Sequence, residues 1–531
     1  MASSEREEAT MATAHHHIVG GGIAGLAAAV YLVRDAGVAG EDITIHEQLG
    51  VSGGSLDGSG DAQQGYLVRG GRMFEEHFAN TFDLLGSIPS ADDPTVSVKE
   101  DVLAFNQMVP GSGNCRLIRD GKPAEDRFTL GLSPHDIFDI NHLILHPENG
   151  LEQRTIDSWF RPEFLESNFW IMWATMFSFQ PWHSLQEMRR YLKRFIHLFP
   201  GFTRIEGILR TRYNQYDSMI APIVAWLRAR GVRMELTKQL VDVTLEGTRQ
   251  SRRITALRMQ DGSSIAVGGM DFVYLTLGSM TDGSALGDND TAPVLDDAPG
   301  GAWTLWRKLA SEHEGFGRPE AFCGDTQKTA WNSFTVTLDG PDFIEFMEDY
   351  SGNRTGTGGL VTIADSGWLM SFVIFHQPHF RGQQHGRYVF WGYGLRGDRP
   401  GDVVKKPMWQ ATGDEIITEL AHHLRLTPEQ KAWFDTAKVR PCRMPFITSQ
   451  FMPRRPGDRP GVRPSGAANF ALMGQFVEQP RDCVFTVEYS VRSARAAVSA
   501  LTHRIDPPPP VARTDLDPLV LARAARVLMG I

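Results

Sequence analysis

The run HHHIVGGGIAGLAAAVYL at residues 15–32 constrains the fold more than any other part of the chain. Its Ile18–Val19 pair predicts the end of a β-strand, and apolar residues at helical spacing after the glycines predict a helix. Three glycines have the spacing GxGxxG: Gly20, Gly22 and Gly25. Such a loop permits a tight turn and lets a pyrophosphate approach the backbone at a helix N-terminus. The run therefore predicts a βαβ unit that clamps a dinucleotide, although a glycine-rich turn of another α/β fold has the same spacing.

The residues that follow indicate which dinucleotide is bound. A second strand, ITIHE at residues 43–47, ends in Glu47, whose carboxylate can accept both hydroxyls of a ribose without a 2′-phosphate. A second glycine-rich loop follows at residues 50–58, and an NAD site has little use for it. Residues 471–498 have the form strand, glycine, loop, helix, which closes over the flavin in flavoproteins of this build. We therefore expect FAD, held by both ends of the chain.

The expected fold class is α/β, with a discontinuous Rossmann-type FAD-binding domain, an interleaved mixed and helical substrate-binding domain and a small C-terminal helical tail. Residues 220–230 look helical, residues 234–247 look like a strand, and residues 271–280 look like a buried strand ending in a glycine turn. The expected boundaries are a disordered N-terminus at 1–14, the FAD-binding domain at 15–105, 203–290 and 441–503, the substrate-binding domain at 106–202 and 291–440, and the tail at 504–531.

Composition excludes several classes of protein. The net charge of −10 gives no support to nucleic-acid binding. Four cysteines have neither a CxxC pair nor metal-ligand spacing, so we expect reduced core thiols, no metal and a cytoplasmic protein: Cys115, Cys323, Cys442 and Cys483. The polar start of the chain does not resemble a signal peptide, and no apolar stretch reaches membrane-spanning length without polar interruption.

The aromatic-rich segment 167–199 is the first candidate for a substrate site. Its second half has an apolar helical face and a basic one, and Tyr191 lies on the apolar face. Periodicity alone favours an ordinary core tyrosine with a satisfied hydroxyl. The alternative is a proton donor beside a lipophilic cavity, where a low dielectric keeps the phenol neutral.

Two further runs combine polar and aromatic residues. Residues 210–223 place Tyr213 and Gln215 just ahead of a helix, with Asp217 as a candidate N-cap. Residues 364–380 alternate like a strand and end in polar side chains that include His376 and His379. Either run could supply donors to a carboxylate headgroup, and either could be capping and turn structure.

The tail ends in an apolar helical segment, residues 515–530, that contains Arg523 and Arg526. It could pack on the protein's own core, mediate dimerisation or contact a membrane surface, in that order of preference. We therefore expect a monomer or homodimer, with peripheral membrane contact as an option.

At this point several motifs resemble the flavin-dependent fatty acid hydratases, or oleate hydratases, once called myosin-cross-reactive antigens. The resemblance runs from about residue 15 to the C-terminus. Besides the clamp with Glu47, it rests on GGSLDG at 53–58, RGGR at 69–72, SNFW and WATMF within 167–177, EMRRY at 187–191, YNQYDSM at 213–219 and PFITSQFMPR at 445–454.

The resemblance implies addition of water across a cis double bond of an unsaturated fatty acid, of the oleate to 10-hydroxystearate type, without net redox change. In that family FAD supports the site electrostatically and works best reduced, and a tyrosine of the EMRRY run donates the proton. That residue is Tyr191 here, so the resemblance favours the proton donor over the core tyrosine.

The chain departs from the family at the glutamate that activates water, which usually follows RGGR directly. Here that position is Met73, and a thioether cannot accept a proton at neutral pH. Our hypothesis is that Glu76, which would share a helical face with Met73, or failing it Glu75, replaces the carboxylate. His77 is a further candidate, and both acids could instead be solvated residues of a first helical turn.

The residues expected at the cofactor are Gly20, Gly22, Ala24, Gly25, Glu47, Gly54, Ser55, Arg72, Val241, Ser279, Val487 and Ser490. Those expected at the substrate carboxylate are Gln215, Tyr213 and Trp391, the last within the strand at 388–395. Because fold does not fix chemistry, the alternatives are a fatty acid double-bond isomerase, a flavin oxidoreductase and a non-catalytic flavin-bound lipid-binding protein.

Overall fold

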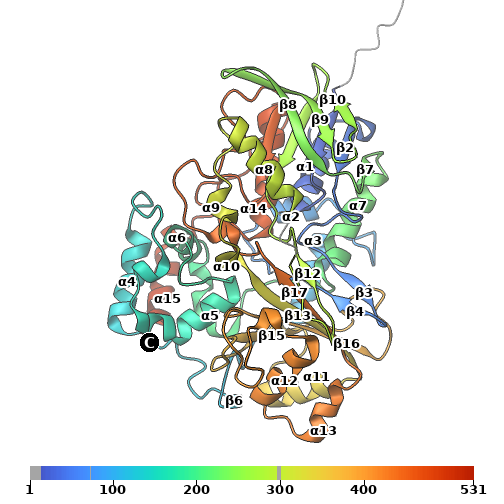
Figure 1. The fold of residues 1–531 in the computed structure, drawn as a ribbon. Coiled ribbons are helices and arrows are strands. Elements are labelled where there is room, and N and C mark those ends of the chain that lie inside the picture. The colour runs from blue at the N-terminus through green and yellow to red at the C-terminus, as the bar shows by residue number, and fades with distance from the viewer. Residues whose placement is uncertain (1–13, 72, 296–299, 531) are drawn as a thin grey trace, which may run out of the picture.

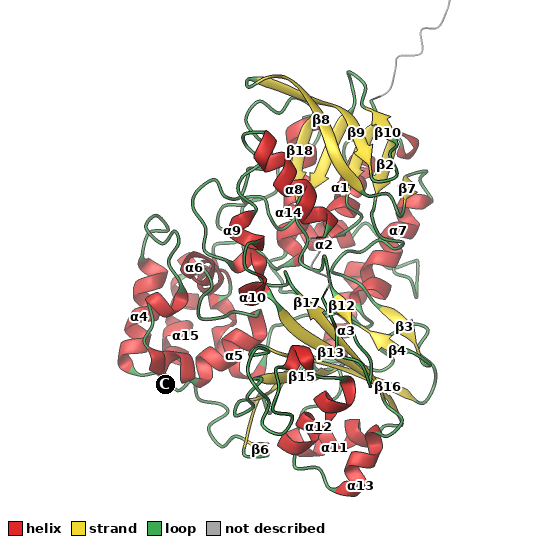
Figure 2. Cartoon of the chain, in the orientation of Figure 1, coloured by secondary structure: helices red, strands yellow, loops and turns green. Residues whose placement is uncertain are grey.

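The computed structural model describes residues 14–71, 73–295 and 300–530 (Figure 1). It is an α/β fold, as the sequence predicts (Figure 2), and strands from distant parts of the chain meet in its two larger sheets. A parallel sheet and a small antiparallel sheet lie at the top of Figure 1, a large mixed sheet lies below them, and a group of helices lies at one side. The expected disorder of residues 1–14 falls almost entirely outside the described residues.

The parallel sheet contains the predicted βαβ unit and has the order β18-β11-β1-β2-β7. Its strands are β1 (His16–Val19), β2 (Ile43–His46), β7 (Arg233–Glu235), β11 (Phe272–Thr276) and β18 (Phe470–Met473). Its helices are α1 (Ile23–Arg34), α2 (Ala79–Leu85), α3 (Val98–Met108), α7 (Ala221–Arg228) and α14 (Val487–Thr502). Since α14 packs against α1, α2 and β18, the C-terminal part of the chain completes the sheet that the N-terminal part begins.

The antiparallel sheet differs from its prediction. The single strand expected at residues 234–247 is two strands, β7 and β8 (Leu240–Thr248), in different sheets. The extended strand is interrupted between β7 and β8, because the N–H groups of Thr237 and Lys238 donate to carbonyls at the end of β2 and in the loop that follows it. The sheet is completed by β9 (Ser251–Met259) and β10 (Ser264–Ala266), and α8 (Gly301–Glu312) packs on β8.

The large mixed sheet has eight strands in the order β12-β17-β13-β16-β15-β14-β5-β6. The strands are β5 (Leu117–Arg119), β6 (Lys122–Pro123), β12 (Ala285–Leu286), β13 (Trp331–Asp339), β14 (Val361–Ile363), β15 (Met370–Ile374), β16 (Arg387–Gly394) and β17 (Lys438–Met444). A two-stranded ribbon of β3 (Ser59–Asp61) and β4 (Gly65–Leu67) packs beside it.

The two faces of this sheet bury different partners. Phe334 and Phe390 share a core with α11 (Asp342–Ser351) and α12 (Gly413–His423). Alternation along a strand turns Trp391 and Tyr393 of β16 to the opposite face, in the main core. That second face forms one wall of the apolar cavity described below.

The helices at the side of Figure 1 come from the first expected substrate-binding segment, 106–202, and from the tail. They are α4 (Pro134–Leu145), α5 (Asn168–Phe177), α6 (Leu185–Arg194) and α15 (Pro518–Met529). A 3₁₀ segment at Ile196–Arg204 follows α6, and α15 packs on it. Short helices complete the fold: α9 (Glu320–Cys323), α10 (Thr326–Thr329) and α13 (Pro428–Lys431).

The strand pairing bears on the expected domain boundaries. Strand β12 falls within the expected segment 203–290 and β17 crosses the boundary at 440, yet both belong to the large mixed sheet. Helix α8, expected in the substrate-binding domain, packs on β8 instead. We propose that the second segment of the large-sheet domain, which joins β5 and β6 of the first segment, begins near residue 285, extends to residue 444 and excludes α8.

Candidate functional site

The first of two neighbouring cavities lies at the carboxyl ends of β1, β2 and β11. The predicted residues that line it are Gly20, Gly22, Ala24, Glu47, Gly54, Ser55, Ser279 and Ser490. Arg69, Gln475 and the start of α8 complete its wall. Ligands of open α/β sheets bind in this crevice, so this nucleotide pocket lies where a dinucleotide is expected.

Backbone geometry explains two of the clamp glycines. Gly20 has φ of +101°, a conformation that favours glycine. A Cβ on Gly25 would lie 1.9 Å from the Gly20 carbonyl oxygen, so only glycine lets α1 pack this closely on β1. A Cβ on Gly22 would meet only the Gly54 Cα, at 3.9 Å, so the space beside Gly22 is open to a ligand.

The N-terminus of α1 and Glu47 have the polarity that a dinucleotide requires. In the described chain α1 has no side-chain cap and no acid in its first turn, which leaves its N–H groups and its dipole to a phosphate. The Glu47 carboxylate accepts from the N–H groups of Gly21 at 2.6 Å and Leu49 at 2.8 Å. Burial raises the pKa of Glu47, and these backbone hydrogen bonds oppose the rise. The pocket therefore fits FAD.

Two other predicted cofactor residues, Val241 and Val487, do not line this pocket. Val241 is next to a lining residue, Leu240, but does not line the pocket itself. Val487, the first residue of α14, lines the second cavity. Arg72 lies outside the described residues.

The second cavity is apolar and lies between α6 and the large mixed sheet. Aromatic and aliphatic side chains form most of its lining, among them Phe177, Phe195 and Val373, which is the surface that an acyl chain requires. Five of the predicted catalytic and substrate residues line it: Met73, Glu75, Tyr191, Gln215 and Trp391. The structure thus brings together side chains that are far apart in the sequence.

Tyr191 is buried, with 1% of its surface exposed, but it lines this cavity. Its hydroxyl donates to the Val484 carbonyl at 2.5 Å. Four phenylalanine rings surround the phenol: Phe177, Phe179, Phe195 and Phe451. Both interpretations of Tyr191 therefore describe part of its setting, since it is a packed residue with a satisfied hydroxyl that also faces a lipophilic space.

The two cavities meet at one loop. Gln475 lines the nucleotide pocket and donates through Nε2 to Ser490 Oγ at 2.8 Å and to the Thr486 carbonyl at 2.9 Å. Its Oε1 accepts from the Phe485 N–H at 2.6 Å. Phe485 and Thr486 line the apolar cavity, next to the Val484 carbonyl that holds Tyr191. A single side chain therefore connects the nucleotide pocket to the loop that positions the phenol.

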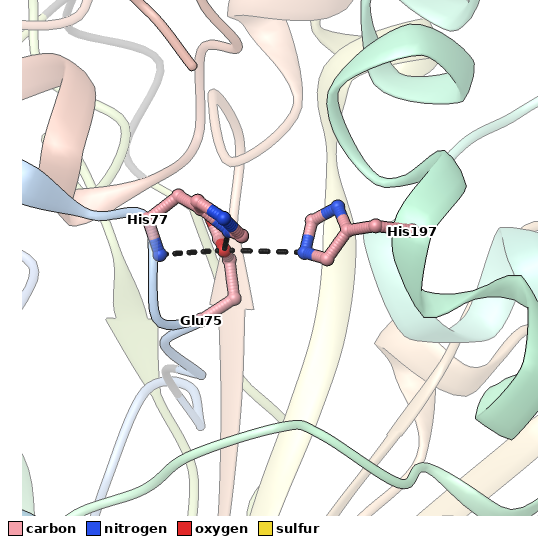
Figure 3. A group of neighbouring side chains, drawn as sticks. All are labelled: Glu75, His77 and His197. Carbon is pink, nitrogen blue, oxygen red and sulfur yellow. Dashed lines mark hydrogen bonds and ion pairs between the residues drawn. The ribbon is translucent and has the colours of Figure 1, made fainter. Parts of the chain in front are cut away.

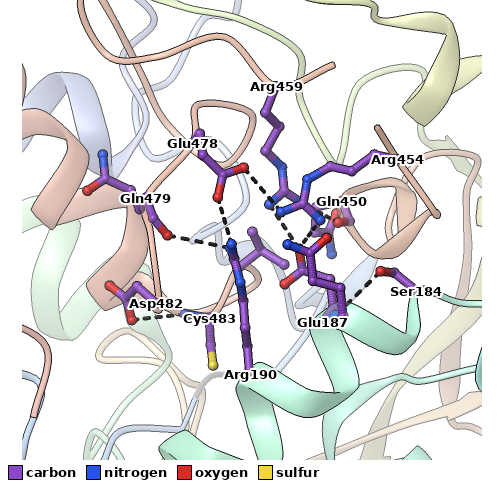
Figure 4. Close-up of polar contacts among 12 residues, drawn as sticks. Ser184, Glu187, Arg190, Gln450, Arg454, Arg459, Glu478, Gln479, Asp482 and Cys483 are labelled. Atoms are coloured by element: carbon purple, nitrogen blue, oxygen red, sulfur yellow. Dashed lines mark hydrogen bonds and ion pairs between the residues drawn. The ribbon is translucent and has the colours of Figure 1, made fainter. Parts of the chain in front are cut away.

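The basic face of α6 is not solvated, and buried ion pairs fix the helix (Figure 4). Glu187 Oε1 pairs with Arg454 at 2.6 Å and with Arg459 at 3.0 Å, and all three side chains are at most 3% exposed. Arg190 pairs with Glu478 at 2.8 Å. Burial raises the pKa of Glu478, but Arg454 and Arg190 outweigh it and lower that pKa to about 2. These pairs fasten the helix that carries Tyr191 to the segment 454–482.

Glu75 is the only one of the two candidate acids that lines the cavity. Its side chain is 1% exposed, whereas that of Glu76 is 76% exposed. The geometric basis for Glu76 is wrong, because residues 73–78 form an extended segment and turn, with Phe74 bridged to Leu209, and α2 begins only at Ala79. Met73 and Glu76 consequently share no helical face.

Glu75 is bound by three basic side chains, two of which sequence reasoning missed. Arg194 Nη1 lies 2.6 Å from Oε1, while His77 Nδ1 at 2.9 Å and His197 Nε2 at 3.3 Å contact Oε2 (Figure 3). Burial raises the pKa of Glu75, but the His197 hydrogen bond and the Arg194 charge outweigh it, and the pKa is lowered. Arg194 and His197 belong to the basic helical face of the segment 167–199, and no local signal in the sequence pairs them with Glu75.

Of the three residues expected at the substrate carboxylate, two line the apolar cavity and one does not. Gln215 and Trp391 line the apolar cavity, as do His376 and His379. Tyr213 is not among the lining residues, and its phenol interacts with Asp92. Asp217 is not the N-cap of α7, which is Ile220, and its own N–H donates to Asn214 Oδ1.

Sequence reasoning also missed Arg210, which lines the cavity near Gln215. Its guanidinium donates only to neutral acceptors: the carbonyls of Gly356 and Val109 and Oδ1 of Asn106. Among the described residues it forms no ion pair, and burial lowers its pKa to about 10. A partly buried cation without an acidic partner attracts a carboxylate.

Comparison with known proteins gives two curated relatives and several solved structures. The oleate hydratase of Streptococcus pyogenes serotype M49 (strain NZ131) is 40% identical over 498 residues, which cover 91% of this chain and 84% of the relative. The linoleate hydratase of Lactiplantibacillus plantarum is 31% identical over 556 residues, covering 96% and 97%.

The solved structures resemble this chain in fold. Wild-type putrescine oxidase superposes with a TM-score of 0.53 at 10% identity, covering 92% of this chain and 98% of that one. Cyclohexylamine oxidase from Brevibacterium oxydans IH-35A has a TM-score of 0.52 at 13% identity, covering 93% and 99%. The MCRA family model matches residues 13–499, so the resemblance expected from the motifs is confirmed and the chain belongs to the MCRA family.

Proposed function

We propose that this protein is an FAD-dependent hydro-lyase that adds water across a cis double bond of an unsaturated fatty acid, of the oleate to 10-hydroxystearate type. The observation that carries the proposal is the Tyr191 phenol, which lines an apolar, aromatic-rich cavity that adjoins the nucleotide pocket. The oleate and linoleate hydratases similar to this chain support the same chemistry.

Protonation of the alkene is the demanding step, because it creates positive charge on carbon in an apolar site. Tyr191 would donate its proton to one alkene carbon after leaving the Val484 carbonyl. Water would then attack the other carbon. Glu75 is the cavity acid available to accept the proton that water loses, in place of the glutamate that Met73 replaces.

The nucleotide pocket would hold the FAD. Gly22 and Gly54 would leave room for the pyrophosphate, the N-terminus of α1 would bind it, and Glu47 would accept from the adenosine ribose. Ser490 and Val487 of α14 would contact the flavin side, where the two cavities meet. Bound FAD would supply shape and electrostatic support to the site without carrying electrons through turnover.

Arg210 would bind the substrate carboxylate, with Gln215 and the histidines of the same wall as further donors. The charge of Arg210 is uncompensated among the described residues, and a carboxylate would form charge-assisted hydrogen bonds with it. Tyr213 has no part in this site, because its phenol interacts with Asp92.

The tail helix gives a weaker indication of partners. Ala524 and Leu528 of α15 are buried, which accounts for packing on the protein's own core. Leu519 and Met529 remain more than half exposed, and α4, with which α15 packs, carries the exposed Leu145. This surface would serve a second copy of the chain or an anionic membrane; sedimentation velocity and vesicle flotation would distinguish the two. Among the described residues no helix is long and apolar enough to cross a bilayer.

The decisive experiment is identification of the product. The enzyme is incubated with oleate, FAD and a reductant in H₂¹⁸O, and the fatty acids are measured by mass spectrometry. Hydration adds one water that carries ¹⁸O, isomerisation adds no mass, and oxidation removes hydrogen. Fatty acid binding without any product would instead identify a lipid-binding protein.

A further inference from the structure

The geometry points to a proton exit path in which Glu75 passes the proton lost by the attacking water to His77, and His77 passes it to solvent. This inference rests on the proposed hydration. The Glu75 carboxylate lines the apolar cavity, and its Oε2 contacts His77 Nδ1 at 2.9 Å (Figure 3). The imidazole side chain of His77 is 33% exposed, so it connects a buried acid with bulk water.

The reaction requires such a path. As the C–O bond forms, an O–H bond of water breaks, and the released proton cannot remain in an apolar cavity. Glu75 takes this proton, Nδ1 of His77 takes it from Glu75, and Nε2 releases a proton to solvent. The Tyr191 phenolate regains one proton, so each turnover releases one proton to solvent and takes one up.

His77 is held for this task by contacts that do not use its ring. Its backbone N–H donates to Glu75 Oε2 at 2.8 Å, and its carbonyl accepts from Arg194 Nη2 at 3.1 Å. The ring itself faces His197 edge-on at 4.7 Å between centroids and lies 4.0 Å from the exposed Glu76 carboxylate. The ring is therefore positioned on Glu75 while a third of the side chain is exposed to water.

His197 is not the exit, although it also contacts Glu75. Its side chain is 8% exposed, and its Nδ1 faces Thr514 Oγ1 of the tail at 3.3 Å. That branch leads to the hydroxyl of a partly exposed threonine, which is not basic enough to take up the proton. His197 is better described as a positioning residue, which helps Arg194 to hold the Glu75 carboxylate toward the cavity.

A metal ion is an alternative ligand for this cluster. The side chains of Glu75, His77 and His197 have ligand atoms that all lie within 4.8 Å of one another. The charge balance opposes this use. Arg194 already neutralises Glu75 at 2.6 Å and also lies 4.0 Å from Asp482. A divalent cation would have to bind next to this buried guanidinium, whereas a single transferred proton adds far less charge.

The test is His77→Asn in the FAD-loaded enzyme, because the amide can still donate to Glu75 but cannot exchange protons. We expect turnover with oleate to fall by about 10²-fold and to be partly restored by added imidazole, which can reach the exposed site. The matched control is His135→Asn on α4. The His135 ring also pairs with an acid, Asp139 at 3.3 Å, but it lies far from His77 in the sequence. Turnover of this control variant should not change.

Each outcome separates the two proposals. Full turnover in His77→Asn, or a loss that imidazole and other small bases do not restore, would overturn the exit path and leave hydration standing. A wild-type enzyme that binds FAD but forms no hydroxy fatty acid would overturn the proposed function and the path together. EDTA should leave wild-type turnover unchanged, and a loss restored by a divalent metal would overturn the path in favour of a metal site.

Discussion

The nucleotide pocket and the apolar cavity adjoin each other but are built in opposite ways. Most of the nucleotide pocket comes from short runs with recognisable local patterns, and much of its lining is backbone at glycines. The apolar cavity is lined by side chains from many separate segments, between Gly71 and Val487. The comparison teaches that a site made of backbone can be found from spacing, whereas a site made of side chains depends on how distant segments meet.

The largest expected effect breaks the chemistry of the cavity while sparing the pocket. Tyr191→Phe removes the proposed acid and should lower turnover by about 10²- to 10⁴-fold, with FAD affinity unchanged. Tyr31→Phe is the matched control, since Tyr31 is also buried and donates to a backbone carbonyl, that of Asn80, but lies outside the cavity. Steady-state kinetics with flavin titration would decide, and an active Tyr191→Phe enzyme would remove the basis of the proposed mechanism.

The second prediction concerns the buried ion pairs that join α6 to the segment 454–482. Arg459→Met removes one of the two arginines on the buried Glu187 and should lower the free energy of unfolding by about 3–5 kcal/mol. Arg455→Met, at an exposed neighbour that contacts Gln153, should have little effect. Urea unfolding followed by fluorescence measures both, and equal stabilities would show that the network does not fasten α6.

The third prediction tests whether Arg210 binds the substrate carboxylate in the apolar cavity. Arg210→Gln should raise the KM for oleate by about 10- to 100-fold, because a charge-assisted contact to the carboxylate is lost. The KM for oleyl alcohol, which has no carboxylate, should change much less. An equal loss for both substrates would mean that Arg210 acts on the fold through its contacts with Gly356 and Val109.

The smallest expected effect concerns Gly22 in the nucleotide pocket. Gly22 has φ of −73°, so alanine fits the backbone there, but its Cβ would enter the space reserved for the pyrophosphate. Gly22→Ala should weaken FAD binding by about tenfold without unfolding the protein. Gly50→Ala, whose Cβ would meet nothing within 4 Å, is the control. Unchanged affinity in Gly22→Ala, measured by flavin fluorescence, would place the pyrophosphate elsewhere.

Sequence and structure agree most closely where interactions are local. The end of β1 at Val19, the glycine turn and the start of α1 follow from residues within one short run. The pattern failed at residues 234–247, where bonds from Thr237 and Lys238 to a distant loop divide one predicted strand into two. It failed again at Glu76, because helical spacing was assumed for a segment that the bridge between Phe74 and Leu209 keeps extended.

Spacing and short motifs were enough to predict the dinucleotide clamp, the α/β class, the family resemblance and Tyr191 as the candidate acid. Folding adds what no short segment contains: Glu75 lines the cavity while Glu76 is exposed, Arg194 and His197 contact Glu75, and Arg210 has no acidic partner among the described residues. These features could not be predicted, because charge compensation and burial arise between segments far apart in the chain, and local periodicity does not indicate which segments come together.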